Sequence, residues 1–441
     1  MKNIKLIKNE TEDKMNKKIL IVNSKSIYSN NATGITLRSL FEKINTENIM
    51  EIYWEKDFED HKISSILLRY SNLSLAHILM KIRNSKVNNE LKKNSSNNKQ
   101  DFILKKILVY IRQYFALVPD LSNLKISKSE YEQIDNFKPD VIYTLGGNIN
   151  SLKVAYNLSE IYNIPIVIHH MDNWMHSIQW ENNPLLFSYK NKLRKYCKQC
   201  YTRSNLALTI SEEMANVFTK EFKIQHYAIM NSIDVKTFKC QPIKNYGPTL
   251  RVTYAGGLHL KRDKALLDIA NIINEICEEG MKIELNIYTN LDNIRLYKSE
   301  FEPFNYVKFH EAVSHDRIMD IYQNTDALVH VESNLLENNE FYKYSISTKI
   351  PEYLSTGKPF IFYGPKTIYL YRFLNDNNIA YTASDKFELE NIIKKLATKE
   401  LNLELTNKAY YYAEKHFDIK HSLEVLMKVL DEASIPVKEE S

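Results

Sequence analysis

The sequence predicts an α/β fold of two domains, each built on a parallel β-sheet covered by helices. Short apolar runs alternate with helical patterns along most of the chain, and this alternation is typical of strands joined by crossover helices. The pattern breaks at the turn signal Asn-Tyr-Gly-Pro, residues 245–248, and then starts again. A chain of 441 residues is also too long for one ordinary core, so we expect two domains.

The first predicted domain spans residues 1–246 and begins, after a polar stretch, with a β-loop-α unit. Residues 18–22 form a compact apolar run, a polar loop leads past Gly34, and residues 35–44 have a helical pattern. The Asn-, Ser- and Lys-rich segment 84–101 is predicted to be a flexible loop. Further strands are predicted at 141–145, 166–169, 206–210 and 227–230, and further helices at 150–162 and 184–198.

The second predicted domain spans residues 247–415, and a final helical segment, 416–441, follows it. Strands are predicted at 251–254, 283–288, 307–310, 327–331 and 360–363, and helices at 264–278, 317–323, 387–396, 405–417 and 422–430, with a further short helix ending at Gly357. Open α/β sheets bind ligands at the carboxyl ends of their strands. We therefore expect the chemistry in the loops after Val22, Leu145, His169, Tyr254 and Val331.

Composition narrows the classes of function. Hydrophobic residues make up 44% of the chain and charged residues 26%, as in soluble globular proteins. No run approaches the roughly 18 apolar residues of a membrane-spanning helix, and the first 18 residues contain lysines and acids in place of a signal-peptide core. We therefore expect a cytoplasmic protein.

The net charge of +5 hides a basic segment at residues 61–120, which holds eleven Lys and Arg against three acids. Within it, residues 102–118 read FILKKILVYIRQYFALV, a basic amphipathic helix that either lies on an anionic membrane at the inner face of the cell or packs on the domain core with its lysines in solvent. Nucleic acid is not expected as a partner, because no motif that reads nucleic acid is recognisable.

The four cysteines are too few for a disulfide scaffold. Cys197-Lys-Gln-Cys200 has the spacing of a redox or zinc pair, but no second pair completes a tetrahedral ligand set. We expect no metal and no cofactor.

The stretch from Phe341 to Gly364 carries the clearest chemical signal. Ser345, Ser347 and Thr348 are residues that cap a helix N-terminus, where free backbone N–H groups hold an anion such as a diphosphate, and Lys349 adds a full positive charge. Glu352, one turn further on, can accept hydrogen bonds from ribose hydroxyls. The alternative is an ordinary capped helix.

A dinucleotide-dependent dehydrogenase uses a similar fold, but its GxGxxG fingerprint is absent. Residues 23–33 contain no glycine, and Tyr-Ala-Gly-Gly-Leu-His at 254–259 lacks the third glycine. We therefore do not expect NAD binding.

Several segments together resemble the GT-B glycosyltransferases, in particular the retaining glycosyltransferase family 4. The segments are PDVIY at 139–143, PIVIHHMDNW at 165–174, LTISEEM at 208–214, MNSID at 230–234, YAGGL at 254–258 and the stretch from Phe341 to Gly364. The resemblance implies two facing Rossmann-like domains, the first holding an acceptor and the second a nucleotide-sugar donor, and a C-terminal helix that crosses back to the first domain.

The resemblance also implies donor contacts in the second domain. Gly256 and Gly257 let the backbone approach the donor, and Lys261 or Arg262 neutralises its diphosphate without a metal. Ser347, Thr348 and Lys349 hold the same diphosphate, and Glu352 matches the second acid of the family's Glu-x7-Glu motif and binds the ribose. The first acid is replaced by Tyr344, and Glu332, Glu337 or Glu340 are the acids that can take over its part.

In the first domain, the resemblance assigns catalytic positions to His169 or His170 together with Asp172, just past a strand end. A histidine there orients a hydroxyl or relays a proton. Gly34 lets the first helix approach the phosphates or the acceptor. The alternatives are a buried core histidine and an aspartate that caps a helix.

These inferences predict a retaining glycosyltransferase that moves a sugar from a UDP- or GDP-linked donor to a glycan or polyprenyl-linked acceptor in cell-surface polysaccharide biosynthesis. The competing hypothesis is a non-catalytic GT-B subunit that binds a partner glycosyltransferase or a glycan.

Overall fold

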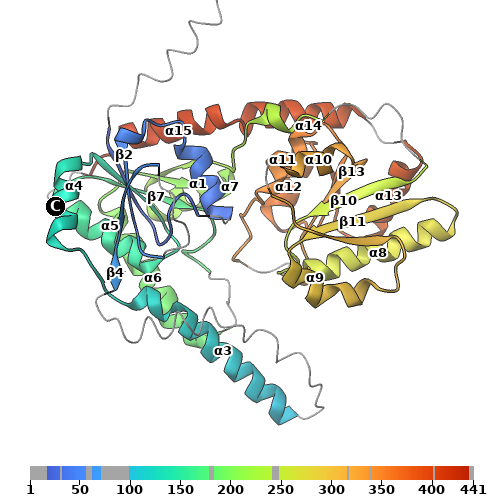
Figure 1. The fold of residues 1–441 in the computed structure, drawn as a ribbon, viewed down its shortest axis with the longest axis horizontal. Coiled ribbons are helices and arrows are strands. Elements are labelled where there is room, and N and C mark those ends of the chain that lie inside the picture. Colours follow the sequence, from blue (N-terminus) through green and yellow to red (C-terminus); the bar gives the residue numbers. More distant parts are fainter. Residues whose placement is uncertain are drawn as a thin grey trace, which may run out of the picture. The chain divides into compact units, whose positions relative to one another are not determined.

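A computed structural model of the chain describes residues 17–29, 32–55, 62–70, 99–177, 183–240, 248–314, 317–336, 340–400 and 403–436 (Figure 1). It divides into two compact units. The first comprises Met1–Ile229 together with Leu423–Ser441, and the second comprises Met230–Ser422. The change from the first unit to the second therefore falls at residue 230, whereas the sequence pointed to a linker near residue 246.

The first unit is built on a seven-stranded sheet whose strand pairs are all parallel, in the order β3-β2-β1-β6-β7-β8-β9. The strands are β1 (Ile19–Val22), β2 (Ile49–Tyr53), β3 (Ser64–Leu67), β6 (Val141–Leu145), β7 (Ile166–His170), β8 (Leu206–Thr209) and β9 (Gln225–Ala228). A separate antiparallel pair joins β4 (Arg69–Tyr70) to β5 (Leu124–Lys125). The strand order reverses between β1 and β6, so this is where the unit has its topological switch point.

The first unit contains helices that cover its sheet and one helix that packs on other helices instead. They are α1 (Ala32–Phe41), α3 (Lys99–Leu121), α4 (Lys128–Phe137), α5 (Ile149–Tyr162), α6 (Phe187–Tyr201), α7 (Glu212–Phe222) and α15 (Ile419–Glu432), with the short turns η1 (Thr46–Asn48) and η3 (Pro184–Leu186). Leu426, Val429 and Leu430 of α15 are fully buried in one hydrophobic core with α1 and the central strands. The last helix therefore completes the first unit, as the predicted crossover helix requires.

The second unit has a six-stranded parallel sheet in the order β12-β11-β10-β13-β14-β15. This is the doubly wound 3-2-1-4-5-6 order of Rossmann folds, with its switch point between β10 and β13. The strands are β10 (Leu250–Ala255), β11 (Ile283–Thr289), β12 (Val307–Glu311), β13 (Ala327–Val331), β14 (Phe360–Tyr363) and β15 (Tyr381–Ala383). The prediction of two α/β units with parallel sheets is confirmed.

Two hydrophobic cores lie on the faces of this sheet. One packs α8 (Arg262–Glu278) and α13 (Lys386–Ala397), and the other packs α10 (Ile318–Gln323), α11 (Lys349–Ser355), α12 (Tyr369–Asp376) and α14 (Leu403–His416). The remaining short elements are α9 (Leu291–Tyr297), η4 (Val235–Phe238), η5 (Lys298–Phe301) and η7 (Asn334–Leu336).

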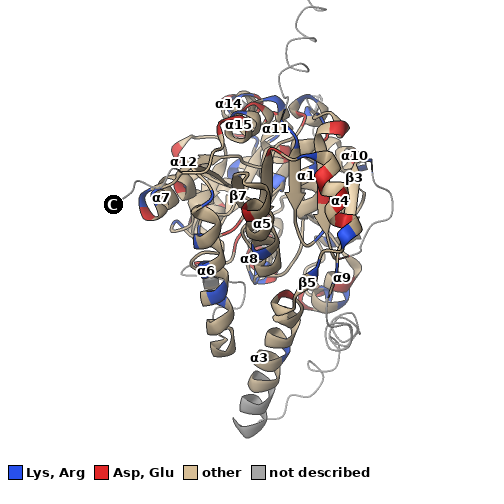
Figure 2. Ribbon diagram, turned by 90° about the vertical axis from the view of Figure 1, so that its left-hand side faces the viewer, with Lys and Arg blue, Asp and Glu red and all other residues tan. Residues whose placement is uncertain are grey.

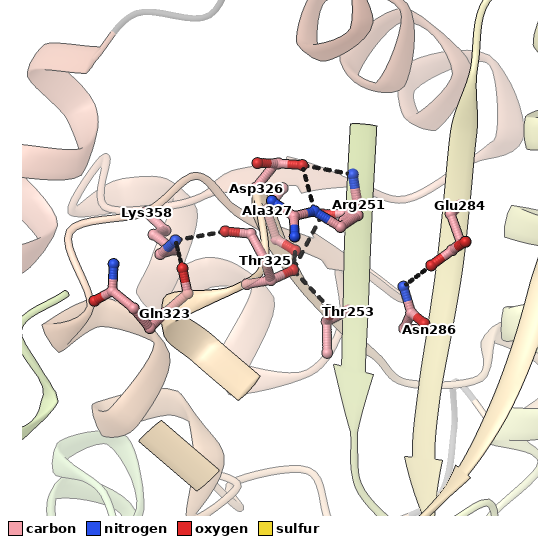
Figure 3. A network of polar contacts seen from close by, with 9 residues as sticks. All are labelled: Arg251, Thr253, Glu284, Asn286, Gln323, Thr325, Asp326, Ala327 and Lys358. Carbon is pink, nitrogen blue, oxygen red and sulfur yellow. Dashed lines mark hydrogen bonds and ion pairs between the residues drawn. The ribbon is translucent and has the colours of Figure 1, made fainter. Parts of the chain in front are cut away.

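A polar network closes the amino-terminal edge of the second sheet (Figure 3). The carboxylate of Asp326 accepts hydrogen bonds from the backbone and side chain of Arg251, and the Nζ of Lys358 donates to the carbonyls of Gln323 and Thr325 at 3.0 and 2.5 Å. These groups lie where β10, β13 and β14 begin, at the edge opposite the carboxyl ends of the strands. We therefore assign the network to stability.

Two further observations bear on the sequence predictions. The segment 84–101 lies outside the described residues up to 98, but its last three residues belong to α3, which corrects the prediction of a loop there. In the part of the chain that the structure describes, no helix is long and apolar enough to cross a membrane.

Candidate functional site

The switch point of the second unit gathers several of the predicted donor residues. After β10 the chain turns through Gly256 and Gly257, and the hydroxyl of Tyr254 donates a hydrogen bond to the carbonyl of Gly257 at 2.7 Å. A Cβ atom on Gly256 would lie only 2.8 Å from that hydroxyl, so a larger residue would displace the tyrosine. Leu260 and Lys261 then have φ of 58° and 60°, a strained left-handed turn that leads into α8.

Arg262, the first residue of α8, forms a two-point ion pair with Glu332, which follows β13. Its Nε and Nη2 lie 3.1 and 2.5 Å from the two carboxylate oxygens, and the side chains are only 13% and 10% exposed. The pair therefore joins the two strand ends that flank the switch point. Arg262 was predicted to meet a diphosphate, and Glu332 was one of the acids named as a replacement for the missing sugar-binding carboxylate.

The pairing of Arg262 with Glu332 determines the charge of both side chains. Burial raises the pKa of the Glu332 carboxyl, but the Arg262 guanidinium and the His330 ring outweigh burial and lower it to about 2. Burial lowers the pKa of Arg262, but Glu332 and Tyr254 together outweigh burial and raise it. Both groups are therefore charged at neutral pH, and the net charge of the pair is zero.

His330 is a member of this cluster that the sequence analysis missed. Its Nε2 lies 3.2 Å from Glu332 Oε1, and its ring stacks between Tyr254 and Phe362. Its Nδ1 is buried and has no hydrogen-bond partner among the described residues. A single histidine inside the otherwise apolar run 327–331 was the signal that could have identified it.

The second group of predicted donor residues lies at the start of α11. The backbone N–H of Lys349 donates to the hydroxyl of Ser347 at 3.4 Å, whereas Thr348 forms no side-chain cap. The Nζ of Lys349 lies 2.9 and 3.1 Å from the carboxylate of Glu352, which also accepts a hydrogen bond from the Tyr322 hydroxyl at 2.6 Å. Glu352 is buried. Its carboxylate, which was predicted to accept hydrogen bonds from ribose, is thus already bonded to two side chains of the protein.

The two groups meet at the same end of the sheet. The Tyr353 hydroxyl, in α11, accepts from the N–H of Ala255 at 3.0 Å and donates to its carbonyl at 3.3 Å, at the end of β10. Tyr344 is buried just before α11, and the Lys343 ammonium lies 5.5 Å from the centre of its ring. Of the other replacement acids, Glu340 pairs with Lys343, and Glu337 lies outside the described residues.

In the first unit, both predicted catalytic histidines are fully buried. Their rings bond to tyrosine hydroxyls: His169 Nδ1 to Tyr143 at 2.7 Å and His170 Nε2 to Tyr201 at 2.8 Å. Burial lowers the pKa of His169 to about 3 and that of His170 well below its usual value. In this structure the two rings are neutral core residues, and contact with a substrate stays a prediction.

The other two predicted residues of the first unit lie in loops. Asp172 follows β7 and is partly buried, and its carbonyl accepts a hydrogen bond from the Trp174 N–H at 2.8 Å. A Cβ atom on Gly34 would lie 2.1 Å from the carbonyl oxygen of Ser29, so only glycine fits. Gly34 thus lets α1 approach its own preceding loop, and its proximity to a ligand stays a prediction.

The cysteines act as buried core residues. The Cys197 and Cys200 thiols donate to the carbonyls of Gly146 and Leu152, and burial raises the pKa of both. Among the residues that the structure describes, no group of three or more His, Cys, Asp or Glu is arranged to hold a metal ion.

Comparison with known proteins identifies the fold. HepE from Anabaena in complex with UDP superposes with a TM-score of 0.62 at 15% identity, covering 94% of this chain and 99% of that one. Sucrose-phosphate synthase from Thermosynechococcus elongatus gives 0.61 at 11% identity, covering 94% and 98%. The lipopolysaccharide outer core galactosyltransferase WaaB gives 0.54 at 12% identity, covering 94% and 99%.

These structures are GT-B glycosyltransferases, and the chain is similar to them over almost its whole length. It has the GT-B fold, as the sequence predicted. No protein-family model matches the sequence, and the search of curated proteins found no match.

Proposed function

We propose that the chain is a glycosyltransferase that moves a sugar from a nucleotide diphosphate donor to an acceptor. The observation that carries the proposal is the switch point of the second unit, where Gly256, Gly257 and Arg262 follow β10, whose last residue Ala255 is hydrogen-bonded to Tyr353 of α11. Ligands of open α/β sheets bind at this position. HepE, which shares the fold, binds UDP and UDP-glucose in its two structures, and this supports a UDP-linked donor.

In the proposed reaction the diphosphate leaves as the sugar transfers, and negative charge grows on its oxygens. The Arg262 guanidinium, the positive end of the α8 helix dipole and the Lys349 ammonium stabilise that charge, an electrostatic contribution that requires no metal. Glu332 holds the guanidinium in a fixed orientation, whereas Lys349 has to share its charge between Glu352 and the donor. GDP is the alternative nucleotide.

We further propose that the sugar is transferred with retention, as in family 4, onto a glycan or polyprenyl-linked acceptor in cell-surface polysaccharide biosynthesis. Such an acceptor places the enzyme at the membrane surface, with residues 102–118 as the contact. Tyr344 takes the position of the missing acid, so the sugar meets a phenol there in place of a carboxylate. Selection of the sugar therefore differs from that of enzymes with both acids.

Donor binding tests the site. We expect UDP or GDP, and their sugars, to bind the purified chain, and Lys349→Ala and Glu352→Ala to weaken binding by on the order of tenfold each. Because Arg262→Ala would leave Glu332 buried and unpaired, the cation is removed with the double variant Arg262→Met/Glu332→Leu. Lys298→Ala, at an exposed position of the same unit, is the control. Titration calorimetry gives the affinities, and unchanged affinity in all the site variants would reject this site.

The second candidate function is a non-catalytic GT-B subunit that binds a partner glycosyltransferase or a glycan. Two observations favour it: Tyr344 replaces an acid, and Glu352 is bonded to Lys349 and Tyr322. A chain that binds a nucleotide but neither hydrolyses its sugar nor transfers it, with membrane extracts as the source of acceptor, would support this function over the first.

A further inference from the structure

Helix α3 turns an apolar stripe to solvent. Ile107, Leu108, Ile111 and Phe115 are 46%, 56%, 38% and 44% exposed. At about 100° per residue these four positions fall within a single arc of roughly 100° on the helix surface. The described side chains of α3 therefore contradict the expectation that its apolar side packs entirely on the domain core.

Contacts on the other sides of α3 fix the direction of the stripe. The Asn183 side-chain amide donates to the Tyr110 carbonyl at 2.8 Å and to Gln113 Oε1 at 2.9 Å. At the end of the helix, the buried Asp120 carboxylate accepts from the backbone N–H groups of Ile149 and Asn150 and from the Tyr189 hydroxyl. The carboxylate thus caps α5 and holds α3 against α5 and α6, which keeps the stripe turned outward.

Helix α6 adds positive charge and further apolar surface on the same end of the first unit (Figures 1 and 2). It has no acidic residue and carries five cations, Lys190, Lys192, Arg194, Lys195 and Lys198. Of these, only Arg194 pairs with a carboxylate among the described residues, that of Glu221. Leu185, in the preceding turn η3, and Phe187, the first residue of α6, are 45% and 71% exposed.

We propose that these two helices form one docking surface for a bilayer that contains anionic phospholipid. The α3–α6 surface is defined by the stripe on α3, by Leu185 and Phe187, and by the exposed Lys192, Lys195 and Lys198. The apolar side chains enter the boundary between head groups and acyl chains, and the ammonium groups meet the lipid phosphates.

The charge of the α3–α6 surface favours an anionic bilayer over a second copy of the chain as its partner. A symmetric dimer through the α3–α6 surface would bring each lysine-rich α6 towards the same helix of its partner, because both copies use one patch. Like charges at such an interface repel each other. A negatively charged lipid surface satisfies both the apolar and the basic parts. The proposal gives the membrane contact a location on α6 as well as on α3, and it does not depend on sugar transfer.

Vesicle flotation of the full chain, without nucleotide sugar, tests the proposal. We expect binding to vesicles of phosphatidylcholine and phosphatidylglycerol in equal parts and little binding to phosphatidylcholine alone. The variant Lys192→Glu/Lys195→Glu/Lys198→Glu should lower the partition coefficient by at least about tenfold. Lys282→Glu/Lys298→Glu/Lys408→Glu reverses three exposed lysines of the second unit, so the net charge changes by the same amount. This control should bind as the native chain does.

The apolar part has its own variant, Leu108→Gln/Ile111→Gln/Phe115→Gln, which should weaken binding to anionic vesicles even at low salt. Circular dichroism confirms that each variant is folded, and UDP titration of the same variants separates lipid binding from donor binding. The proposal is rejected if the native chain does not bind anionic vesicles. It is likewise rejected if the control variant of the second unit loses as much vesicle binding as the variant with three reversed lysines on α6. It is also rejected if the chain sediments as a dimer that the apolar variant dissociates, since a second copy then covers the surface.

Discussion

At the residue scale, the ion pair of Arg262 and Glu332 has two roles that need different experiments. It fixes the cation that we propose for the diphosphate, and it keeps two charges paired where little water reaches them. Removing one partner of a buried pair leaves the other charge without compensation, which costs far more than replacing both partners by apolar groups.

We therefore expect Glu332→Ala to lower the free energy of unfolding of the second unit by about 3 kcal/mol. The double variant Arg262→Met/Glu332→Leu should recover most of that loss, because neither charge remains. Urea denaturation of the native chain, both single variants and the double variant completes the cycle. Equal losses in the single and double variants would show that the pairing does not contribute to stability.

The buried histidines of the first unit predict a pH dependence. Burial lowers the pKa of His169 to about 3 and that of His226 to about 4, below the value of about 6.5 in an unfolded chain. Their contribution to stability is therefore complete above pH 6.5 and is lost as the pH falls towards the folded-state pKa. At pH 5 each histidine should cost about 2 kcal/mol.

Urea denaturation at pH 7 and pH 5 measures this loss. His226→Gln should reduce the difference between the two pH values, whereas His421→Gln, at an exposed position of α15, should leave it unchanged. If His226→Gln keeps the full difference, the acid sensitivity comes from other groups.

At the scale of elements, the network at the amino-terminal edge of the second sheet separates stability from function. Lys358 is buried, and its Nζ bonds the two carbonyls that link α10 to β13. Lys358→Met keeps the length of the side chain but leaves both carbonyls without this donor. We expect a loss of about 2 kcal/mol in stability with no change in UDP affinity, measured by urea denaturation and calorimetry. A large loss of affinity would contradict the assignment of this edge to structure.

The sequence predicted the buried central strands best. The bounds of β6 and β13 were predicted to the residue, because short, mainly apolar runs of this length are typical of strands covered on both faces. Strand β2 was missed because Glu51 interrupts its apolar pattern. That carboxylate accepts hydrogen bonds from the Ser26 hydroxyl and the Ile27 N–H. It therefore orders the loop after β1, and the same residue hides the strand pattern in the sequence.

The sequence predicted where the residues of the candidate site lie, but it did not predict which of them form ion pairs. Glycines 256 and 257, Arg262 and the start of α11 all lie at the sheet end that the loop rule indicated. The pairing of Arg262 with Glu332 joins residues 70 apart in the chain, and only the tertiary structure brings them together. The pairing of Lys349 with Glu352 was within reach of the sequence, since positions i and i+3 of a helix are neighbours.

At the scale of the whole molecule, α15 makes the stability of the first unit depend on the last residues of the chain. Leu430 is fully buried in the core of that unit. We expect Leu430→Ala to lower the unfolding free energy of the first unit by about 3 kcal/mol and to leave the second unit unchanged. Differential scanning calorimetry should show one shifted transition and one constant transition. Glu424→Ala, at an exposed position of the same helix, is the control.

The return of α15 also sets an order for folding during synthesis. The second unit is continuous in sequence, from Met230 to Ser422. The first unit is discontinuous, because Leu426, Val429 and Leu430 of α15 complete a core most of whose other residues lie between Ile19 and Ile229. Domains usually fold in the order in which they emerge during synthesis. Here the first unit, whose sheet is translated first, receives the last helix of its core only after the whole second unit has been synthesised.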